Sequence, residues 1–302
     1  MKKFLLVFSA SAFLFCVDAQ PSFGVKVVGK GNPIIFIPGL NGSGDVWNTT
    51  VAHYKNNYTC YVITLAGFAG QPPVKQKDSL LLLQRDQIIQ YIKDKHLYKP
   101  VITGFSFGGV LALWVATSAP DLVGPVIDVD GLPFESAFEN ANINKDSIAA
   151  IAQQRHDFIL KQTPEAWQRI YQSRNSPKKL AMAKQDLKAL VTDTTKIPII
   201  IAWDKATDLR SSYLMQTEMS TLDLRNELAK LKQPLLFLGS WKGWNDITTL
   251  QIATAEYQLQ LAAAKNAKLM MSEEGKHFLM WDDYSWMIYE MDAFLKNSTI
   301  AK

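Results

Sequence analysis

The chain has 302 residues, of which 48% are hydrophobic and 20% are charged, and its formal net charge is +4. A chain of this length and apolar content can bury a sizeable core. Its lysines are scattered and form no basic stripe interleaved with aromatic residues, which excludes a typical nucleic-acid-binding surface. After the first residues, no segment is apolar over the ~20 residues that a membrane-spanning helix needs, which excludes stable membrane insertion of the mature chain.

Residues 1–19 have the pattern of an export signal. Two lysines follow the initial methionine, residues 4–17 are apolar, and small side chains precede a cleavage position after Ala19. Cleavage there would release a periplasmic or secreted protein. Cys16 follows the bulky Phe15, whereas a lipid-attachment cysteine prefers a small residue before it, so we do not expect a lipoprotein.

The mature chain would keep a single cysteine, Cys60, so it could form no intramolecular disulfide. Cys60 lies in the strand-like alternation of residues 58–63, which favours a buried, inert thiol.

Strand-like and helix-like patterns alternate through the first half of the mature chain. Short runs rich in Val and Ile are typical of buried parallel strands. The predicted strands are 25–28, 33–38, 60–65, 100–104 and 123–129, and the predicted helices are 47–54, 80–95 and 110–118. This alternation indicates an α/β fold, a doubly wound and mostly parallel sheet with right-handed crossovers and helices on both faces.

The pattern changes after residue 133. Residues 134–207 are mostly helical and amphipathic and are interrupted by three prolines. The α/β pattern then resumes, with predicted helices 222–230, 248–264 and 286–295 and predicted strands 234–239 and 267–271. We therefore expect a core of residues 20–133 and 208–302, with residues 134–207 as a cap over the carboxyl edge of the sheet. Aromatic residues of the cap could form an apolar ceiling or the cap's own core: Phe134, Phe138, Phe158, Trp167 and Tyr171.

Residues 104–108 read Gly-Phe-Ser-Phe-Gly between a predicted strand and a predicted helix. The turn forces Ser106 into a strained conformation and exposes its hydroxyl at the carboxyl edge of the sheet, while the glycines let neighbouring elements pass closely. The helix that follows offers backbone N–H groups and the positive end of its dipole to an anion. In this context the motif indicates a nucleophilic serine.

A serine nucleophile needs a base, and the base needs a partner that orients it. His277 follows the last predicted strand and returns to the same sheet edge as Ser106, so we predict it as the general base. Asp246 is the only acid in the loop 240–246, and we predict it as the carboxylate that orients His277, although it could also cap the following helix. Asp130 and Asp208 are the alternatives.

The oxyanion formed by attack on a carbonyl needs two backbone donors. Phe107 directly follows the nucleophile, and Leu40 lies in the glycine-rich segment 39–44 after a predicted strand. We predict that their N–H groups form the oxyanion hole. This chemistry requires no metal ion and no organic cofactor.

Several stretches make the chain resemble the α/β-hydrolase superfamily, in the capped branch that includes lipases, esterases and aminopeptidases. They are Pro38-Gly39-Leu40 with Gly42-Ser43 and Trp47, Gly67-Phe68-Ala69-Gly70, Gly104-Phe105-Ser106-Phe107-Gly108-Gly109, and His277-Phe278 with Asp282-Asp283. The resemblance covers essentially all of the mature sequence and implies an α/β-hydrolase fold with a helical cap inserted after the sixth strand. It also implies the roles given above to Ser106, His277, Leu40 and Phe107. The family's acid usually follows its strand more closely than Asp246 does.

The sequence thus predicts an exported serine hydrolase that cleaves a small to medium carboxylic ester, or an amide, through an acyl-serine intermediate. A serine at the nucleophile position disfavours epoxide hydrolase and haloalkane dehalogenase chemistry, which needs a carboxylate. One alternative is a ligand-binding protein with negligible turnover. Another is an aminopeptidase of the proline-iminopeptidase type, which would need an acidic anchor in the cap such as Glu135, Glu139 or Glu165.

Overall fold

The computed structural model describes residues 21–75, 79–137, 144–244 and 248–298. The predicted export signal, with Cys16, and the predicted acid Asp246 lie outside these residues. Within the described ranges, every helix is too short or too polar to span a bilayer.

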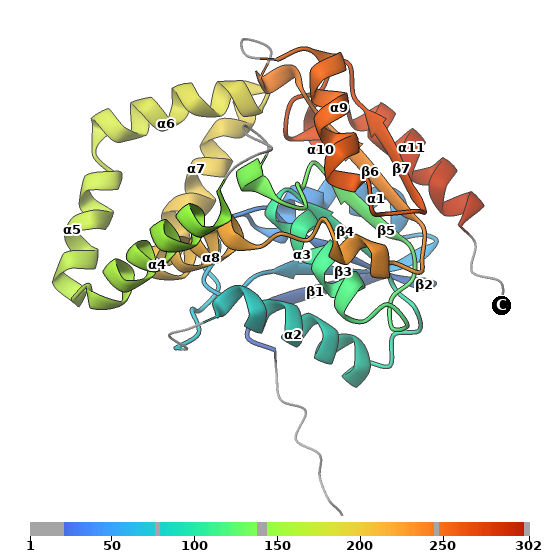
Figure 1. Ribbon diagram of the computed structural model, residues 1–302, viewed down its shortest axis with the longest axis horizontal. Coiled ribbons are helices and arrows are strands. Elements are labelled where there is room, and N and C mark those ends of the chain that lie inside the picture. Colours follow the sequence, from blue (N-terminus) through green and yellow to red (C-terminus); the bar gives the residue numbers. More distant parts are fainter. Residues whose placement is uncertain (1–20, 76–78, 138–143, 245–247, 299–302) are drawn as a thin grey trace, which may run out of the picture.

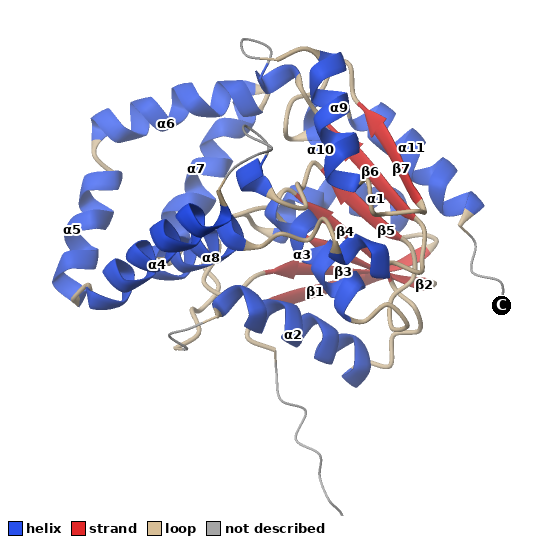
Figure 2. Cartoon of the chain, viewed as in Figure 1, coloured by secondary structure: helices blue, strands red, loops and turns tan. Residues whose placement is uncertain are grey.

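The described strands form one sheet in the order β1-β3-β2-β4-β5-β6-β7 (Figures 1 and 2). The strand β1 runs antiparallel to β3, and all other neighbouring strands are parallel. The bounds are β1 (Gly24–Gly29), β2 (Asn32–Ile37), β3 (Tyr58–Thr64), β4 (Val101–Phe105), β5 (Val126–Val129), β6 (Leu235–Gly239) and β7 (Ala267–Met271). This confirms the predicted doubly wound, mostly parallel sheet.

Helices cover both faces of the sheet. Successive side chains of a strand point to opposite faces, and the inner strands are apolar on both. On β2, Ile35 and Ile37 belong to the core under α2, α3 and α9, whereas Ile34 and Phe36 belong to the core under α1, α10 and α11. The bounds of these helices are α1 (Asn48–Tyr54), α2 (Leu80–Asp94), α3 (Phe107–Ser118), α9 (Leu250–Leu261), α10 (Leu279–Asp282) and α11 (Tyr284–Asn297).

A helical segment separates β5 from β6. Its helices are α4 (Lys145–Lys161), α5 (Pro164–Arg174), α6 (Pro177–Leu190), α7 (Ile197–Ala206) and α8 (Leu209–Thr221). Figure 1 shows α4 to α7 as an open frame to one side of the sheet. The helical segment follows the fifth strand of the chain. The prediction placed it after the sixth strand, which is one strand too late. The three predicted interruptions, Pro164, Pro177 and Pro198, lie in the first turns of α5, α6 and α7, where a missing N–H leaves no bond unmade.

The prediction was wrong at the end of this segment. The helix α8 was not predicted, because its serines and threonines break the apolar pattern, yet it packs against α2 and α4. The predicted helix 222–230 is reduced to a short 3-10 turn, Glu227–Lys230. The Asp223 side chain accepts a hydrogen bond from the Arg225 backbone N–H at 3.1 Å, and such local bonds compete with a helix.

Candidate active site

Ser106 occupies the turn between β4 and α3. Its backbone has φ 54° and ψ −121°, a left-handed conformation that costs energy for a residue with a side chain. The surroundings hold it there, because its N–H donates to the Val129 carbonyl at 2.8 Å and its carbonyl accepts from the Gly109 N–H at 2.8 Å. This is the strained turn predicted from the sequence.

Two glycines make this turn possible. A Cβ on Gly104 would lie 2.0 Å from the Gly108 carbonyl oxygen, and a Cβ on Gly108 would lie 2.4 Å from the Pro38 carbonyl oxygen. Neither distance is compatible with a side chain, so strand, turn and helix approach this closely only because both positions are glycine.

His277 lies between β7 and α10, at the same sheet edge as Ser106. Both residues line two cavities, one of about 410 Å³ and one of about 380 Å³. The imidazole packs on the Phe105 ring, with centroids 4.8 Å apart, and its Nδ1 lies 2.6 Å from Oδ2 of Asp130. With an ionised Asp130 as acceptor, Nδ1 carries the ring proton and Nε2 is left as a proton acceptor.

Asp130 follows β5 and is 6% exposed. Besides the His277 contact, its Oδ2 accepts from the Ser240 hydroxyl at 2.6 Å, and its Oδ1 accepts from the Ser240 N–H at 2.8 Å and the Tyr257 hydroxyl at 2.6 Å. A buried carboxylate is stable only when it is paired and hydrogen-bonded, and these donors meet that condition. The arrangement holds one carboxylate in a fixed orientation against His277.

The acid that contacts His277 is therefore one of the two alternatives. Asp208 caps α8, where its side chain accepts from the N–H and the hydroxyl of Ser211 at 2.8 and 2.6 Å. Asp246, which was expected to orient the His277 ring, lies outside the described residues, and Nδ1 of that ring is bonded to Asp130. Sequence reasoning did not single out Ser240 or Tyr257.

A sequence signal for Asp130 did exist. The family's acid usually lies close behind the strand that corresponds to β6. In this chain the first residue after β6 is Ser240, which has no carboxylate, so the acid has to come from another strand. In the sheet, β5 lies between β4 and β6. An acid at the carboxyl end of β5 therefore comes next to Ser106 at the end of β4.

The two predicted oxyanion donors flank Ser106. Leu40 lies in the loop after β2 and lines the 380 Å³ cavity, while Phe107 begins α3 and lines the 410 Å³ cavity. The loop backbone is close to the serine, because a Cβ on Gly39 would lie 3.4 Å from the Ser106 Cβ. Among the described residues, neither the Leu40 N–H nor the Phe107 N–H has a hydrogen-bond acceptor.

The cap helices contact this loop. The Asn41 side-chain amide donates to Asp204 Oδ1 of α7 at 2.8 Å, and Arg174 of α5 pairs with the same carboxylate. The Thr207 hydroxyl donates to the Asn41 carbonyl at 3.3 Å. These contacts fix the loop that carries Leu40 from the cap side.

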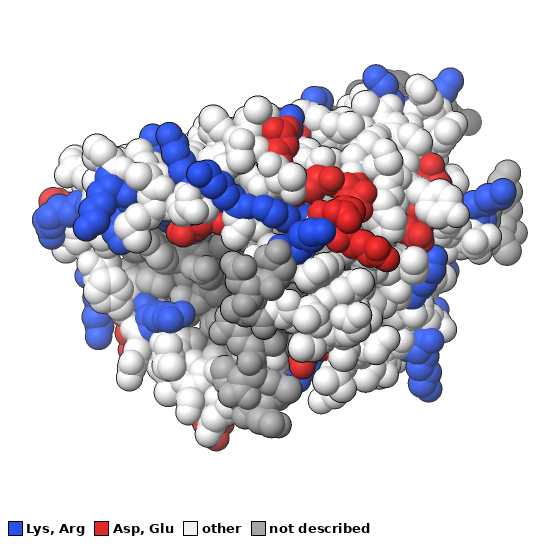
Figure 3. Space-filling model, turned by 90° about the horizontal axis from the view of Figure 1, so that it is seen from above, with Lys and Arg blue, Asp and Glu red and all other residues white. Residues whose placement is uncertain are grey.

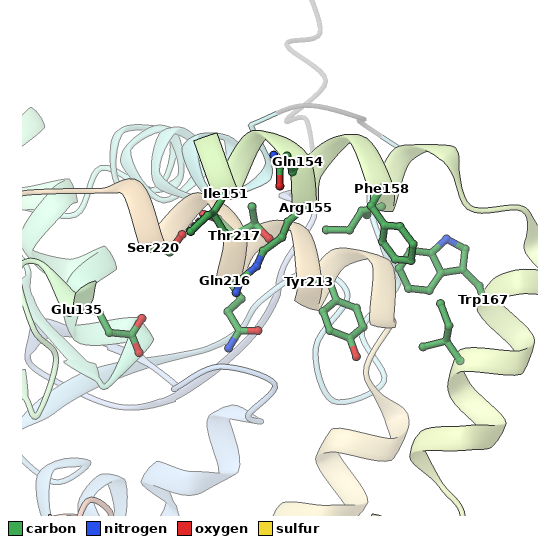
Figure 4. Close-up of a pocket in the computed structure, with 12 residues that line it drawn as sticks. Glu135, Ile151, Gln154, Arg155, Phe158, Trp167, Tyr213, Gln216, Thr217 and Ser220 are labelled. Carbon is green, nitrogen blue, oxygen red and sulfur yellow. Dashed lines mark hydrogen bonds between the residues drawn. The ribbon is translucent and has the colours of Figure 1, made fainter. Parts of the chain in front are cut away.

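A third cavity of about 850 Å³ lies inside the cap (Figure 4). Glu135 lines both this cavity and the 410 Å³ cavity. Glu135 keeps solvent exposure, yet the protein around its carboxyl removes part of the water and raises the pKa of this group, an effect that the nearby His277 partly offsets. Of the other predicted cap acids, Glu165 lies in the first turn of α5 and Glu139 lies outside the described residues.

Charged side chains also lie outside this site, on the surface of the molecule. Figure 3 shows lysine and arginine side chains in a band on one face, beside a patch of acidic side chains. His53 pairs with Asp292 at 3.0 Å on the surface. In the part of the chain that the structure describes, no three His, Cys, Asp or Glu side chains are grouped so that they could hold a metal ion.

Known proteins resemble this chain in sequence. A model of the family described as "Alpha/beta hydrolase family" matches residues 34–286. The chain is 25% identical over 270 residues to a pimeloyl-[acyl-carrier protein] methyl ester esterase of Aliivibrio fischeri (strain MJ11), covering 88% of this chain and 95% of that protein. It is 26% identical over 209 residues to the protein of the same name from Aliivibrio salmonicida, covering 68% and 72%.

Solved structures share the fold. The enol-lactonase from Burkholderia xenovorans LB400 matches with a TM-score of 0.66 and 14% identity, covering 91% of this chain and 96% of that one. MenH from S. aureus matches with a TM-score of 0.64 and 16% identity, covering 91% and 99%.

Proposed function

Because the chain belongs to the alpha/beta hydrolase family, we propose that it is an exported serine hydrolase that cleaves a small to medium carboxylic ester through an acyl-serine intermediate. The observation that carries the proposal is the 2.6 Å contact between His277 and the buried Asp130, beside the strained Ser106. The relatives named as methyl ester esterases support an ester over other acyl compounds.

In the proposed reaction, the Ser106 hydroxyl attacks the ester carbonyl while His277 Nε2 takes its proton. Asp130 holds the ring and stabilises the imidazolium. The Leu40 and Phe107 N–H groups donate to the oxyanion of the tetrahedral intermediate. His277 then gives the proton to the departing alcohol, and the acyl group stays on Ser106. A water molecule, deprotonated by His277, releases the acid and restores the serine.

A second candidate is cleavage of an amide next to a free amino group. Glu135 favours it, because this carboxylate borders the cavity that Ser106 and His277 line and has no ion-pair partner among the described residues. Comparing alanine nitroanilide with its N-acetylated form would decide between the two: turnover of the free amine alone would support the aminopeptidase, and turnover of neither, with nitrophenyl acetate cleaved, would support the esterase.

The export signal is tested separately from the chemistry. Expression of the full chain, followed by cell fractionation and amino-terminal sequencing, should give a protein that begins at Gln20 outside the cytoplasm. A protein that keeps residues 1–19 would contradict export and leave the proposed reaction untouched.

The reaction is tested by labelling the mature protein with a fluorophosphonate and locating the label by mass spectrometry. We expect a label on Ser106 that is lost in Ser106→Ala and strongly slowed in His277→Ala, with both variants folded by circular dichroism. A folded wild-type protein that neither labels nor cleaves nitrophenyl acetate would favour the ligand-binding alternative.

A further inference from the structure

The cavity inside the cap, which we call the cap chamber, is larger than either cavity beside Ser106. It lies between α4, α5 and α8 and has a volume of about 850 Å³, within the range typical of ligand sites. Glu135 borders both the chamber and the 410 Å³ cavity, so the chamber lies next to the cavity that Ser106 lines. Attack on a small ester does not need this additional space.

The far end of the chamber is aromatic. Figure 4 shows Phe158 of α4, Trp167 of α5 and Tyr213 of α8 together at this end. The Trp167 and Tyr213 rings stack with centroids 6.0 Å apart, while Phe158 is 59% exposed although it lines a cavity. Uncovered rings gain free energy when an apolar group covers them, so this end suits an aromatic or branched apolar group.

The middle of the chamber carries a positive charge. In Figure 4 the Arg155 side chain runs from α4 toward Gln216 of α8. Among the described residues, Arg155 has neither an ion-pair nor a hydrogen-bond partner. A guanidinium beside apolar side chains binds a carboxylate through paired hydrogen bonds.

The near end of the chamber has the opposite charge. Glu135 stands apart from Arg155 in Figure 4, on the side that leads to Ser106. An anionic group placed there would meet a carboxylate, whereas the same group further along would meet Arg155. The two ends therefore select the position of a negative charge along a bound chain.

We propose that the cap chamber binds the acyl part of an ester whose chain carries a carboxylate part-way along and an aromatic or branched apolar group at its end. The carboxylate lies against Arg155 and the end group against Trp167, while the ester carbonyl lies at Ser106. The last placement rests on the proposed function, and the other two do not.

Two matched nitrophenyl esters test the proposal. One is the γ-ester of N-benzoylglutamate, which has a free carboxylate between its ester and its ring, and the other is the ester of benzamidobutanoate, which lacks only that carboxylate. The wild-type protein should favour the carboxylated ester by about tenfold in kcat/KM, which corresponds to one charge-assisted contact. Nitrophenyl acetate reports on the reacting centre alone.

The Arg155→Gln variant should lower this preference to about one, and Arg155→Lys should restore part of it. Arg169→Gln, which removes an exposed cap arginine outside the chamber, is the matched control and should keep the full preference. Trp167→Ala should lower kcat/KM for both benzoylated esters relative to the acetate by about tenfold. An unchanged preference in Arg155→Gln, or no preference in the wild type, would overturn the proposal.

A binding measurement separates this proposal from the proposed reaction. Calorimetry on Ser106→Ala compares the γ-methyl ester of N-benzoylglutamate with methyl benzamidobutanoate. The carboxylated ester should bind about tenfold more tightly, and the double variant Ser106→Ala with Arg155→Gln should bind both esters equally. If this holds while the wild type cleaves no ester, the proposed reaction fails and the chamber stands. If nitrophenyl acetate is cleaved but the binding difference is absent, the chamber proposal fails.

Discussion

The substitution Asp130→Asn removes the charge that faces His277 and replaces one oxygen by an NH₂ group. All four contacts of Asp130 come from donors: His277, Ser240 twice and Tyr257. An NH₂ in place of Oδ1 would face the Ser240 backbone N–H, which cannot turn away, and would leave a buried donor unpaired at a cost of about 1–3 kcal/mol. An NH₂ in place of Oδ2 would face the Ser240 hydroxyl, which can turn to accept, and His277 Nδ1.

We therefore expect the asparagine to place its NH₂ at the Oδ2 position. His277 then accepts at Nδ1 and carries its proton on Nε2, so it cannot take the proton of Ser106. The same change of tautomer in a serine protease lowers kcat by about 10⁴, which corresponds to about 5 kcal/mol of transition-state stabilisation. The free energy of unfolding should fall by no more than about 1 kcal/mol, because the Ser240 N–H, the Tyr257 hydroxyl and the new NH₂ keep acceptors and only the Ser240 hydroxyl loses Oδ2.

The assay is the kcat of nitrophenyl acetate hydrolysis, with urea unfolding of the same preparations. Asp128→Asn is the matched control, because Asp128 is also buried at the end of β5 and its Oδ1 accepts from the Gly131 N–H at 2.8 Å, a bond that asparagine can keep. Burial raises the pKa of Asp128 well above its ordinary value, and unlike Asp130 this carboxyl has no contact with His277 among the described residues. An Asp130→Asn variant within tenfold of wild type, together with a 10⁴-fold loss in Asp246→Asn, would refute this reasoning and restore Asp246 as the acid.

Three further predictions concern individual side chains. Tyr257→Phe removes one donor to Asp130 and should lower kcat for nitrophenyl acetate about threefold to tenfold and stability by about 1 kcal/mol; an unchanged kcat would show that the remaining donors suffice. Burial raises the pKa of the Cys60 thiol to about 11, so iodoacetamide at neutral pH should label Cys60 only after unfolding, which mass spectrometry would detect. Burial raises the pKa of Asp223, but its hydrogen bonds with Arg225 and Lys145 outweigh burial and hold the pKa well below its ordinary value. Asp223→Asn should therefore lower the free energy of unfolding by about 2 kcal/mol above about pH 4, and the difference from wild type should shrink as the pH falls further; a pH-independent difference would contradict the ion pair as its cause.

Local patterns were sufficient to predict the sheet. The bounds of β6 and β7 match the predicted ranges within one residue. The strand β6 is buried and continuously apolar, as is typical of an inner parallel strand, whereas β7 lies at the sheet edge and contains the exposed Lys268. The helix α8 was missed because tertiary packing against α2 and α4, rather than its own periodicity, stabilises it.

The candidate site was predictable only where a motif is local. The turn at Ser106 was predicted from the five residues 104–108. His277 was predicted from its place in the loop after the last predicted strand. The partner of His277 is a different problem, because Asp130 is 147 residues away and the contact depends on the order of strands in the sheet. Ser240 after β6 shows only that the usual position of the acid lacks a carboxylate, and the order of the strands is needed to choose Asp130 in its place.

The cap helices form hydrogen bonds with two parts of the site, the oxyanion loop and the segment that follows His277. On one side, Asp204 of α7 holds Asn41 in the loop that carries Leu40. On the other, the Leu190 carbonyl at the end of α6 accepts from the Phe278 N–H at 3.3 Å, directly after His277. A change in the cap should therefore reach the oxyanion loop even when the substrate is too small to touch the cap.

Asp204→Ala tests this coupling, because it removes the acceptor shared by Asn41 and Arg174. Loss of one oxyanion donor costs about 10²–10³ in kcat, so a loosened loop that still forms the hole part of the time should cost about tenfold. The KM for nitrophenyl acetate should stay close to wild type, because this ester makes few contacts beyond its carbonyl. Asp157→Ala, which removes an exposed aspartate of α4, should leave both constants unchanged. If Asp204→Ala changed KM alone, the cap would act on substrate entry and the contact between Asp204 and Asn41 would have no part in positioning the oxyanion loop.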